Sequence, residues 1–234
     1  MPPPAGGFFC GRGIGIMGPM AKLILQRHLL SKWNKENKFT GWQDVPLSEE
    51  GLAQAPMVAS KLPVKPDEVY TSPLVRNKET ARLIAENISV RPVFLASEDS
   101  TEVGENELSI YLTKALDERC YGKLEGKNKD EVKKEFGEEQ VHLWRRSWDV
   151  APPGGESLED VYNRALAFFQ NKIEPKLRQD KNILIVGSHN SLRALAKYLE
   201  KIPDDVIADY EIPFGGMIVY DLDDNLSVVK KEVK

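Results

Sequence analysis

Two matched segments, more than a hundred residues apart, decide the fold. The first reads LQRHLLSKWN at residues 25–34, and the second reads IVGSHNSLR at residues 185–193. Each begins in an apolar, β-branched run that predicts a buried strand, and each has a histidine where that strand should end. Adjacent parallel strands would bring both histidines to one crevice at their carboxyl ends, where open α/β sheets bind ligands. Two imidazoles with an arginine suit a phosphate, because one nitrogen can attack phosphorus while the other groups neutralise its oxygens.

The composition indicates an ordinary globular chain. Its 234 residues fit one α/β domain, and 41% hydrophobic with 29% charged residues is typical of such a domain. A net charge of −4 argues against nucleic acid as a partner, because a nucleic-acid-binding domain is usually basic. No apolar run approaches the ~20 residues that cross a membrane. Cys10 and Cys120 have no metal-ligand spacing, so we expect no bound metal and a cytoplasmic location.

Residues 1–19 differ from the rest of the chain. They are rich in glycine and proline, which leaves few positions for a helix or a strand, and they lack the unbroken apolar region of a signal peptide. We therefore expect a flexible Gly/Pro-rich extension over residues 1–19 and a single domain over residues 20–234.

From residue 22 onward, strand and helix patterns alternate. The pattern predicts strands at residues 22–27, 67–71, 89–95, 182–188 and 217–222. Helices are expected from Ser48 to about residue 61, from Ser72-Pro73 with Pro73 at the first helical position to about residue 86, over 157–176 and 191–201, and in pieces near 105–115 and 128–147. This alternation predicts an α/β fold, three-layer α/β/α with a mostly parallel central sheet.

Polar residues near the predicted strand ends could carry chemistry on a phosphate. A neutral His28, fixed by a hydrogen bond at one ring nitrogen, could accept a phosphoryl group. Arg27 and Arg76 could neutralise that group, and Glu118 beside Arg119 could act as acid and base for a substrate hydroxyl. Each residue alone also fits a structural or surface role, and it is their grouping that favours a site.

Further candidates lie in the loops. Thr40-Gly41 allows close backbone approach to an anion, although it also fits a simple turn before the next helix. Lys129, Arg145 and Arg146 would concentrate positive charge in an acidic protein, although they also fit an exposed helix face. His142 has no comparable neighbours and is expected to be a surface or structural residue.

At these residues the chain resembles the bisphosphoglycerate-dependent phosphoglycerate mutases of the histidine phosphatase superfamily. The resemblance runs in colinear order over about residues 21–222. Its motifs are RHxxSxWNKENxFTGW at 27–42, TSxLxR at 71–76, ERxYGxLxGxNK at 118–129, RRSxDVxPPGGESL at 145–158 and NSLRAL at 190–195. The block at 145–158 is typical of the mutases, and simpler phosphatases of the superfamily usually lack it.

The resemblance implies a phosphoglycerate mutase-like fold and a set of residue roles. His28 would carry the phosphoryl group, and Glu118 would be the acid and base. The group in transfer would be held by Arg27, Arg76 and His189. The other anionic ends of the substrate would be bound by Ser31, Asn34, Thr40, Gly41, Arg119, Tyr121, Lys129, Arg145, Arg146 and Asn190.

The implied reaction interconverts 3-phosphoglycerate and 2-phosphoglycerate in glycolysis and gluconeogenesis. It would run through a phosphohistidine enzyme primed by 2,3-bisphosphoglycerate, without a metal, and the family implies a homodimer or homotetramer. Two other functions stay open: a histidine-type phosphatase, and a degenerate, non-catalytic protein that binds phosphate ligands. Capping of the pocket by Lys129, Arg145 and Arg146 would favour the mutase, because it would retain the bisphosphate and exclude water.

The chain departs from the family pattern at both histidines. The glycine expected after His28 is Leu29, which would be strained by roughly 1–2 kcal/mol if φ is positive there, and Leu30 replaces a polar neighbour. In the second motif, Ser188 stands where the family has histidine, and His189 stands where it has glycine. Either His189 replaces the lost histidine through a one-residue shift or bulge of the strand, or turnover is crippled. Because nearly all other anion ligands remain, we favour compensation.

Overall fold

The fold is built around two central parallel strands. The computed structural model describes residues 21–96 and 104–234, so the extension expected over 1–19 lies outside the described residues. Strand β1 (Lys22–Arg27) pairs in parallel with β5 (Ile183–Gly187), and Arg27 lies opposite Gly187 at their carboxyl ends. These are the two apolar runs that precede the histidines, and their predicted adjacency is confirmed.

The other strands extend this pair into a seven-stranded sheet with the order β3-β4-β2-β5-β1-β6-β7. On one side, β2 (Glu68–Thr71), β4 (Glu107–Leu112) and β3 (Arg91–Leu95) continue the parallel arrangement. On the other side, β6 (Met217–Leu222) runs antiparallel to β1, and β7 (Val228–Val233) runs antiparallel to β6. The mostly parallel sheet predicted from the sequence is confirmed.

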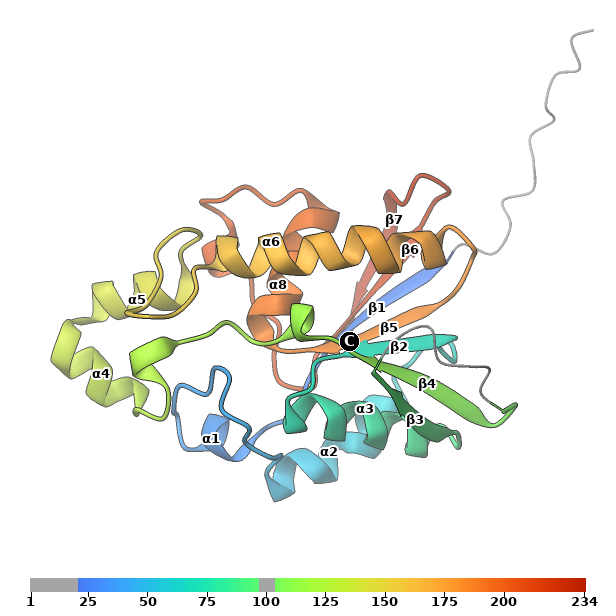
Figure 1. Ribbon diagram of the computed structural model, residues 1–234, viewed down its shortest axis with the longest axis horizontal. Coiled ribbons are helices and arrows are strands. Elements are labelled where there is room, and N and C mark those ends of the chain that lie inside the picture. Colours follow the sequence, from blue (N-terminus) through green and yellow to red (C-terminus); the bar gives the residue numbers. More distant parts are fainter. Residues whose placement is uncertain (1–20, 97–103) are drawn as a thin grey trace, which may run out of the picture.

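Helices cover both faces of the sheet (Figure 1). One layer holds α2 (Glu49–Ala59) and α3 (Val75–Asn87). The other layer holds α6 (Leu158–Phe168), α7 (Glu174–Leu177) and α8 (His189–Glu200), with a π-helical turn at Phe169–Ile173 joining α6 to α7.

The side chains of β1 point alternately to the two faces of the sheet, so this strand packs against both helical layers. Leu23 and Leu25 are fully buried in the core beneath α6 and α8, whereas Ile24 is buried in the core beneath α2 and α3. Strands that are apolar on both faces are typical of parallel sheets enclosed by helices. The three-layer α/β/α prediction is therefore confirmed.

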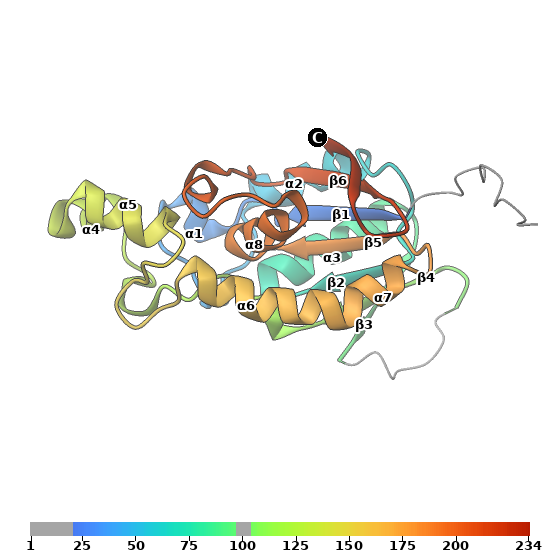
Figure 2. The same ribbon diagram turned by 90° about the horizontal axis from the view of Figure 1, so that it is seen from above.

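A smaller helical unit projects beyond the carboxyl ends of the strands, and both ribbon views show it at the same end of the molecule as α1 (Lys32–Lys35) (Figures 1 and 2). It consists of α4 (Lys129–Phe136) and α5 (Glu138–Arg146), separated by Gly137 at φ 87°. Its own core is formed by Phe39, Leu124, Val132, Val141 and Trp144. The helical pieces predicted at 128–147 are thus present as two helices.

Two sequence predictions are wrong in detail. Residues 107–112 form strand β4 instead of a helix, because this segment pairs with β2 and β3 and buries Leu108 and Ile110 in the sheet. Helix α3 begins at Val75 and not at Pro73, because the side chain of Asp44, distant in sequence, accepts the hydrogen bond of the Val75 N–H at 2.6 Å.

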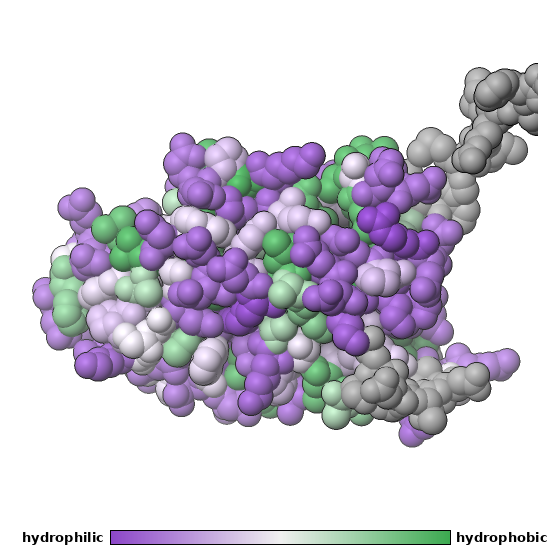
Figure 3. Space-filling view, turned by 45° about the horizontal axis from the view of Figure 1, so that its top comes forward, coloured by the Kyte–Doolittle hydropathy of each residue, from purple (hydrophilic) through white to green (hydrophobic). Residues whose placement is uncertain are grey.

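The surface seen in Figure 3 is mainly hydrophilic, with small scattered hydrophobic areas. Within the described residues, no helix combines the length and the apolar character that a membrane crossing requires.

Candidate active site

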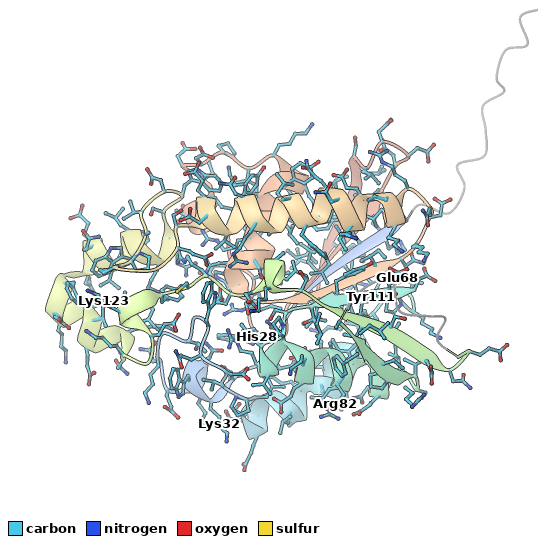
Figure 4. All side chains as sticks on the ribbon, viewed as in Figure 1. His28, Lys32, Glu68, Arg82, Tyr111 and Lys123 are labelled. Carbon is cyan, nitrogen blue, oxygen red and sulfur yellow. The ribbon has the colours of Figure 1, made fainter. Side chains whose placement is uncertain are left out.

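The two histidine segments meet at one edge of the sheet. His28 directly follows β1, and its backbone N–H donates to the Gly187 carbonyl at the end of β5, at 2.9 Å. Figure 4 shows His28 at this edge of the sheet, whereas Glu68, the first residue of β2, lies toward the opposite end. A cavity of about 70 Å³ opens at this edge. Its wall contains the predicted residues Arg27, His28, Asn34, Thr40, Gly41, Arg76, Glu118, Tyr121, Lys129, Arg145, His189 and Asn190.

His28 is held as a neutral imidazole with one free nitrogen. Its Nδ1 lies 2.7 Å from the Leu29 carbonyl oxygen, and since a carbonyl only accepts, Nδ1 carries the hydrogen. Nε2 is then left with its lone pair. Burial, together with the positive charges of Arg76 and Arg27, holds the pKa of His28 well below 6.5. The residue is therefore fixed in the tautomer that a nucleophile requires.

Two guanidinium groups flank this nucleophile, one fully buried and one partly buried. Arg76 is fully buried and donates to the Gly41 carbonyl at 2.8 Å and to the Gln43 carbonyl at 2.9 Å. Arg27 donates to the Ile212 carbonyl, and its guanidinium carbon lies 3.7 Å from the centre of the Phe214 ring. These contacts fix the direction of two permanent positive charges beside His28.

Within the described part of the chain, Glu118 is hydrogen-bonded through one of its two oxygens. Oε1 accepts from the Arg119 N–H at 2.7 Å, the Asn190 N–H at 3.1 Å and the Asn190 amide at 2.9 Å. Burial opposes ionisation, but the Arg119 hydrogen bond, His189 and the Asn190 amide together lower the pKa of Glu118 to about 2. A carboxylate that is ionised at neutral pH can accept a proton from a substrate hydroxyl.

Basic residues of the helical unit contribute to the cavity wall. Lys129 begins α4 and Arg145 lies near the end of α5, and both side chains line the wall. Burial lowers the pKa of both, and their mutual proximity lowers that of Lys129 further. The cavity thus gathers positive charge in a protein whose net charge is −4.

Three predicted site residues do not line this cavity. Ser31 is fully buried and caps α1, and its hydroxyl donates to the Asn34 side chain at 2.6 Å. Arg119 donates to the Tyr121 hydroxyl at 3.1 Å, so it supports a wall residue. Arg146 is ion-paired with Glu211.

The second motif begins where β5 ends. The pairings of β5 with β1 and β2 are regular, so no bulge lies within the paired residues of β5. That His189 compensates for the missing histidine stays a prediction. Ser188 is fully buried as the N-cap of α8, where its hydroxyl accepts from the Asn77 amide at 3.1 Å. His189 is the first residue of α8, and its ring lines the cavity without any strand distortion.

Leu29 also fits its position without backbone strain. The φ angle of Leu29 is not positive. The backbone strain that a positive φ would cause at this position is therefore not present. Its side chain is fully buried in the core between the sheet and α2. A Cβ added at Gly215 would lie 3.3 Å from Leu29 Cδ2, which shows that the glycine leaves room for the leucine.

Sequence reasoning missed three wall residues and one residue behind the wall. Lys38 and Phe39 belong to the first motif, but their own residue types gave no specific signal. Phe214 packs 5.8 Å from the His28 ring, centre to centre, and Glu211 bonds His189. Both lie in a loop with no recognisable pattern. Among the described residues, no cluster of potential metal ligands is present.

Comparison with known proteins shows the family of this chain. The family model of the histidine phosphatase superfamily (branch 1) matches residues 23–232. The 2,3-bisphosphoglycerate-dependent phosphoglycerate mutase of Parvibaculum lavamentivorans is 41% identical over 90% of this chain and 95% of its own length. The protein of the same name from Chlamydia muridarum is 43% identical over 86% of this chain and 94% of its own. The solved structure of Bacillus stearothermophilus YhfR has a TM-score of 0.72 at 27% identity, covering 89% of this chain and 94% of that one.

Proposed function

Because the chain belongs to the histidine phosphatase superfamily, we propose that it interconverts 3-phosphoglycerate and 2-phosphoglycerate with 2,3-bisphosphoglycerate as primer. The observation that carries the proposal is the pairing of His28, whose Nε2 is free, with the ionised Glu118 in one basic cavity. The reaction belongs to glycolysis and gluconeogenesis. We expect it to take place in the cytoplasm, in a homodimer or homotetramer.

Each part of the reaction has a matching group in the cavity. The primer supplies the phosphoryl group. His28 uses its Nε2 lone pair to form the N–P bond as the P–O bond of the donor breaks, and Arg27 and Arg76 offset the charge on the oxygens. Glu118 takes the proton from the phosphoglycerate hydroxyl that receives the group, and later returns it to the oxygen that leaves.

Donors in the cavity wall support a ligand that carries several anionic groups. Thr40 lines the cavity, and its buried Oγ1 has no hydrogen-bond partner among the described residues. A buried hydroxyl of this kind is costly unless a ligand or water satisfies it. Together with the wall residues Lys129 and Arg145, it fits the phosphates and carboxylate of a bisphosphoglycerate. The same wall residues support retention of the primer over release and hydrolysis.

Labelling of the enzyme tests the nucleophile. Wild-type protein mixed with radiolabelled 2,3-bisphosphoglycerate should acquire an acid-labile, base-stable phosphohistidine, and His28→Ala should acquire none because the attacking nitrogen is gone. His142→Ala is the matched control, since His142 is exposed and should leave labelling unchanged. Labelled His28→Ala would refute the assignment. A wild-type protein that binds 3-phosphoglycerate without labelling would favour the non-catalytic alternative, and rapid release of inorganic phosphate would favour the phosphatase.

A further inference from the structure

A glutamate outside every motif contacts both His189 and Arg146. Glu211 Oε2 lies 2.9 Å from His189 Nε2, and Oε1 forms an ion pair with Arg146. The adjoining residues are held to the active site, because the Ile212 carbonyl accepts from Arg27 and the Gly215 N–H donates to the His28 carbonyl at 3.2 Å. The loop that contains Glu211 is therefore hydrogen-bonded to Arg27 and to the backbone of His28.

This contact bears on the second histidine of the family pattern, which this chain lacks at position 188. Ser188 cannot supply the missing group, because it is fully buried and its hydroxyl is engaged with Asn77. Of the three histidines in the chain, only His28 and His189 line the cavity, whereas His142 is exposed. His189 is thus the one imidazole available to assist His28.

Two contacts at Nε2 bear on which nitrogen of His189 carries the hydrogen. The Glu211 carboxylate lies 2.9 Å from Nε2 and can only accept, whereas the Ile212 N–H approaches the same nitrogen at 3.5 Å, at the limit of a hydrogen bond. Because the contact with Glu211 is much shorter, we assign the hydrogen to Nε2. Nδ1 has no hydrogen-bond partner among the described residues. Glu211 is ionised at neutral pH, because the His189 hydrogen bond and Arg146 overcome the effect of burial and lower its pKa to about 2.

We propose, on the basis of the function proposed above, that Glu211 is a positioning residue for phosphoryl transfer. It holds the His189 ring through Nε2–H, so that Nδ1 takes the place of the missing histidine beside the phosphoryl group carried by His28. This is the role that a carboxylate plays behind a catalytic imidazole: it fixes the tautomer and stabilises the protonated ring.

The charges around His189 agree with this role. Burial, with Arg27 and Arg193, holds its pKa at about 4, although Glu211 and Glu118 act in the opposite direction. A phosphoryl dianion in the cavity would favour protonation of Nδ1, because an opposite charge nearby stabilises the imidazolium. The protonated ring would then lie between the Glu211 carboxylate and the phosphoryl oxygens.

The role of Glu211 is tested first by kinetics. Glu211→Gln should slow phosphoryl transfer to His28 by about 10- to 100-fold, the usual effect of weakening a hydrogen bond to a charged group. The KM should not rise, because Glu211 does not line the cavity and the change leaves the wall residues Lys129 and Arg145 in place. In a His189→Ala background the Glu211→Gln change should have no further effect on the rate. Glu86→Gln is the control, since Glu86 is a similarly exposed partner of Arg82 on α3.

Two kinetic results would overturn the inference. One is an undiminished rate in Glu211→Gln. The other is an equal loss in the presence and absence of His189, which would mean that Glu211 acts through something other than the imidazole.

A spectroscopic readout separates this inference from the proposed function. Side-chain nitrogen NMR at neutral pH should find His189 in the Nε2–H tautomer in the wild type, and in a mixture of tautomers in Glu211→Ala. An unchanged tautomer in that variant would overturn the positioning role even in an active enzyme. A wild-type protein without phosphoryl transfer would instead refute the proposed function, and with it the catalytic part of the role of Glu211.

Discussion

Leu29 follows the nucleophile His28 directly and stands where the family pattern has glycine. Its backbone still serves the site: the carbonyl fixes His28, and the N–H donates to Thr80 Oγ1 at 3.1 Å. Its side chain turns away from the cavity into the core, where Gly215 leaves space for it. The leucine is thus part of a repacked site, which supports compensation over decay.

Replacing Leu29 by glycine should therefore harm the protein. The change empties a fully buried position and adds backbone freedom next to His28, so we expect the free energy of unfolding to fall by about 3–5 kcal/mol and turnover to drop. Urea titration and steady-state assays measure the two effects. Leu30→Gly is the matched control and should cost less, because Leu30 is only partly buried. Higher activity in Leu29→Gly would mark the leucine as a lesion.

Residues of the cavity wall were predictable where the chemistry lies in the side chain itself. Arg27 and His28 were predicted from their residue types at a strand end and Glu118 from its carboxylate beside Arg119, and the structure brings all three to one cavity. Glu211 was not predictable, because an isolated acidic residue in a loop resembles any solvated glutamate until its partners are known. The same holds for Phe214, whose contact with Arg27 depends on tertiary structure.

At the scale of the element, the start of α8 decides how the second motif works. Ser188 caps the helix together with Ser191, and the Asn190 N–H in the first turn donates to Glu118. Because β5 keeps its register, the histidine at 189 enters the site from the helix instead of from the strand end.

Placing the family's histidine at position 188 should not increase activity. Ser188→His would force an imidazole into a filled position and remove the cap, so we expect a loss of about 2–4 kcal/mol in stability and no gain in kcat. Ser188→Ala is the milder control, with a cost of about 1 kcal/mol. Thermal unfolding and kinetics on both variants provide the check. A Ser188→His enzyme faster than the wild type would show that the natural serine impairs the site.

Elements with strong apolar runs were predictable, whereas elements defined by distant partners were not. β1 and β5 are buried on both faces and were recognised as strands. β4 was mistaken for a helix because its six residues lie in a long charged region, and its strand character comes from pairing with β2 and β3. The start of α3 was misplaced because its first N–H is satisfied by Asp44 from another loop.

For the whole molecule, two buried histidines should make stability depend on pH. Burial lowers the pKa of both His28 and His189, the latter to about 4. Below pH 6.5 the unfolded chain binds protons at these sites while the folded protein does not, so stability is highest above pH 6.5 and falls as the pH decreases. His189 alone should cost about 2 kcal/mol at pH 5 relative to pH 8.

Chemical denaturation between pH 5 and pH 8 measures this dependence. His189→Asn should flatten the curve, and His142→Asn should leave it unchanged because that side chain is exposed. A curve for His189→Asn that coincides with the wild type would show that His189 is protonated normally in the folded protein.

At the scale of the whole molecule, we infer that the two altered motifs together form one working active site. The most direct test is the conversion of 3-phosphoglycerate to 2-phosphoglycerate by purified protein, with and without added 2,3-bisphosphoglycerate. We expect turnover that depends on the bisphosphate, with the phosphoryl group passing through His28. A folded protein that binds 3-phosphoglycerate but does not convert it at any bisphosphate concentration would show that the two altered motifs do not form a working mutase site.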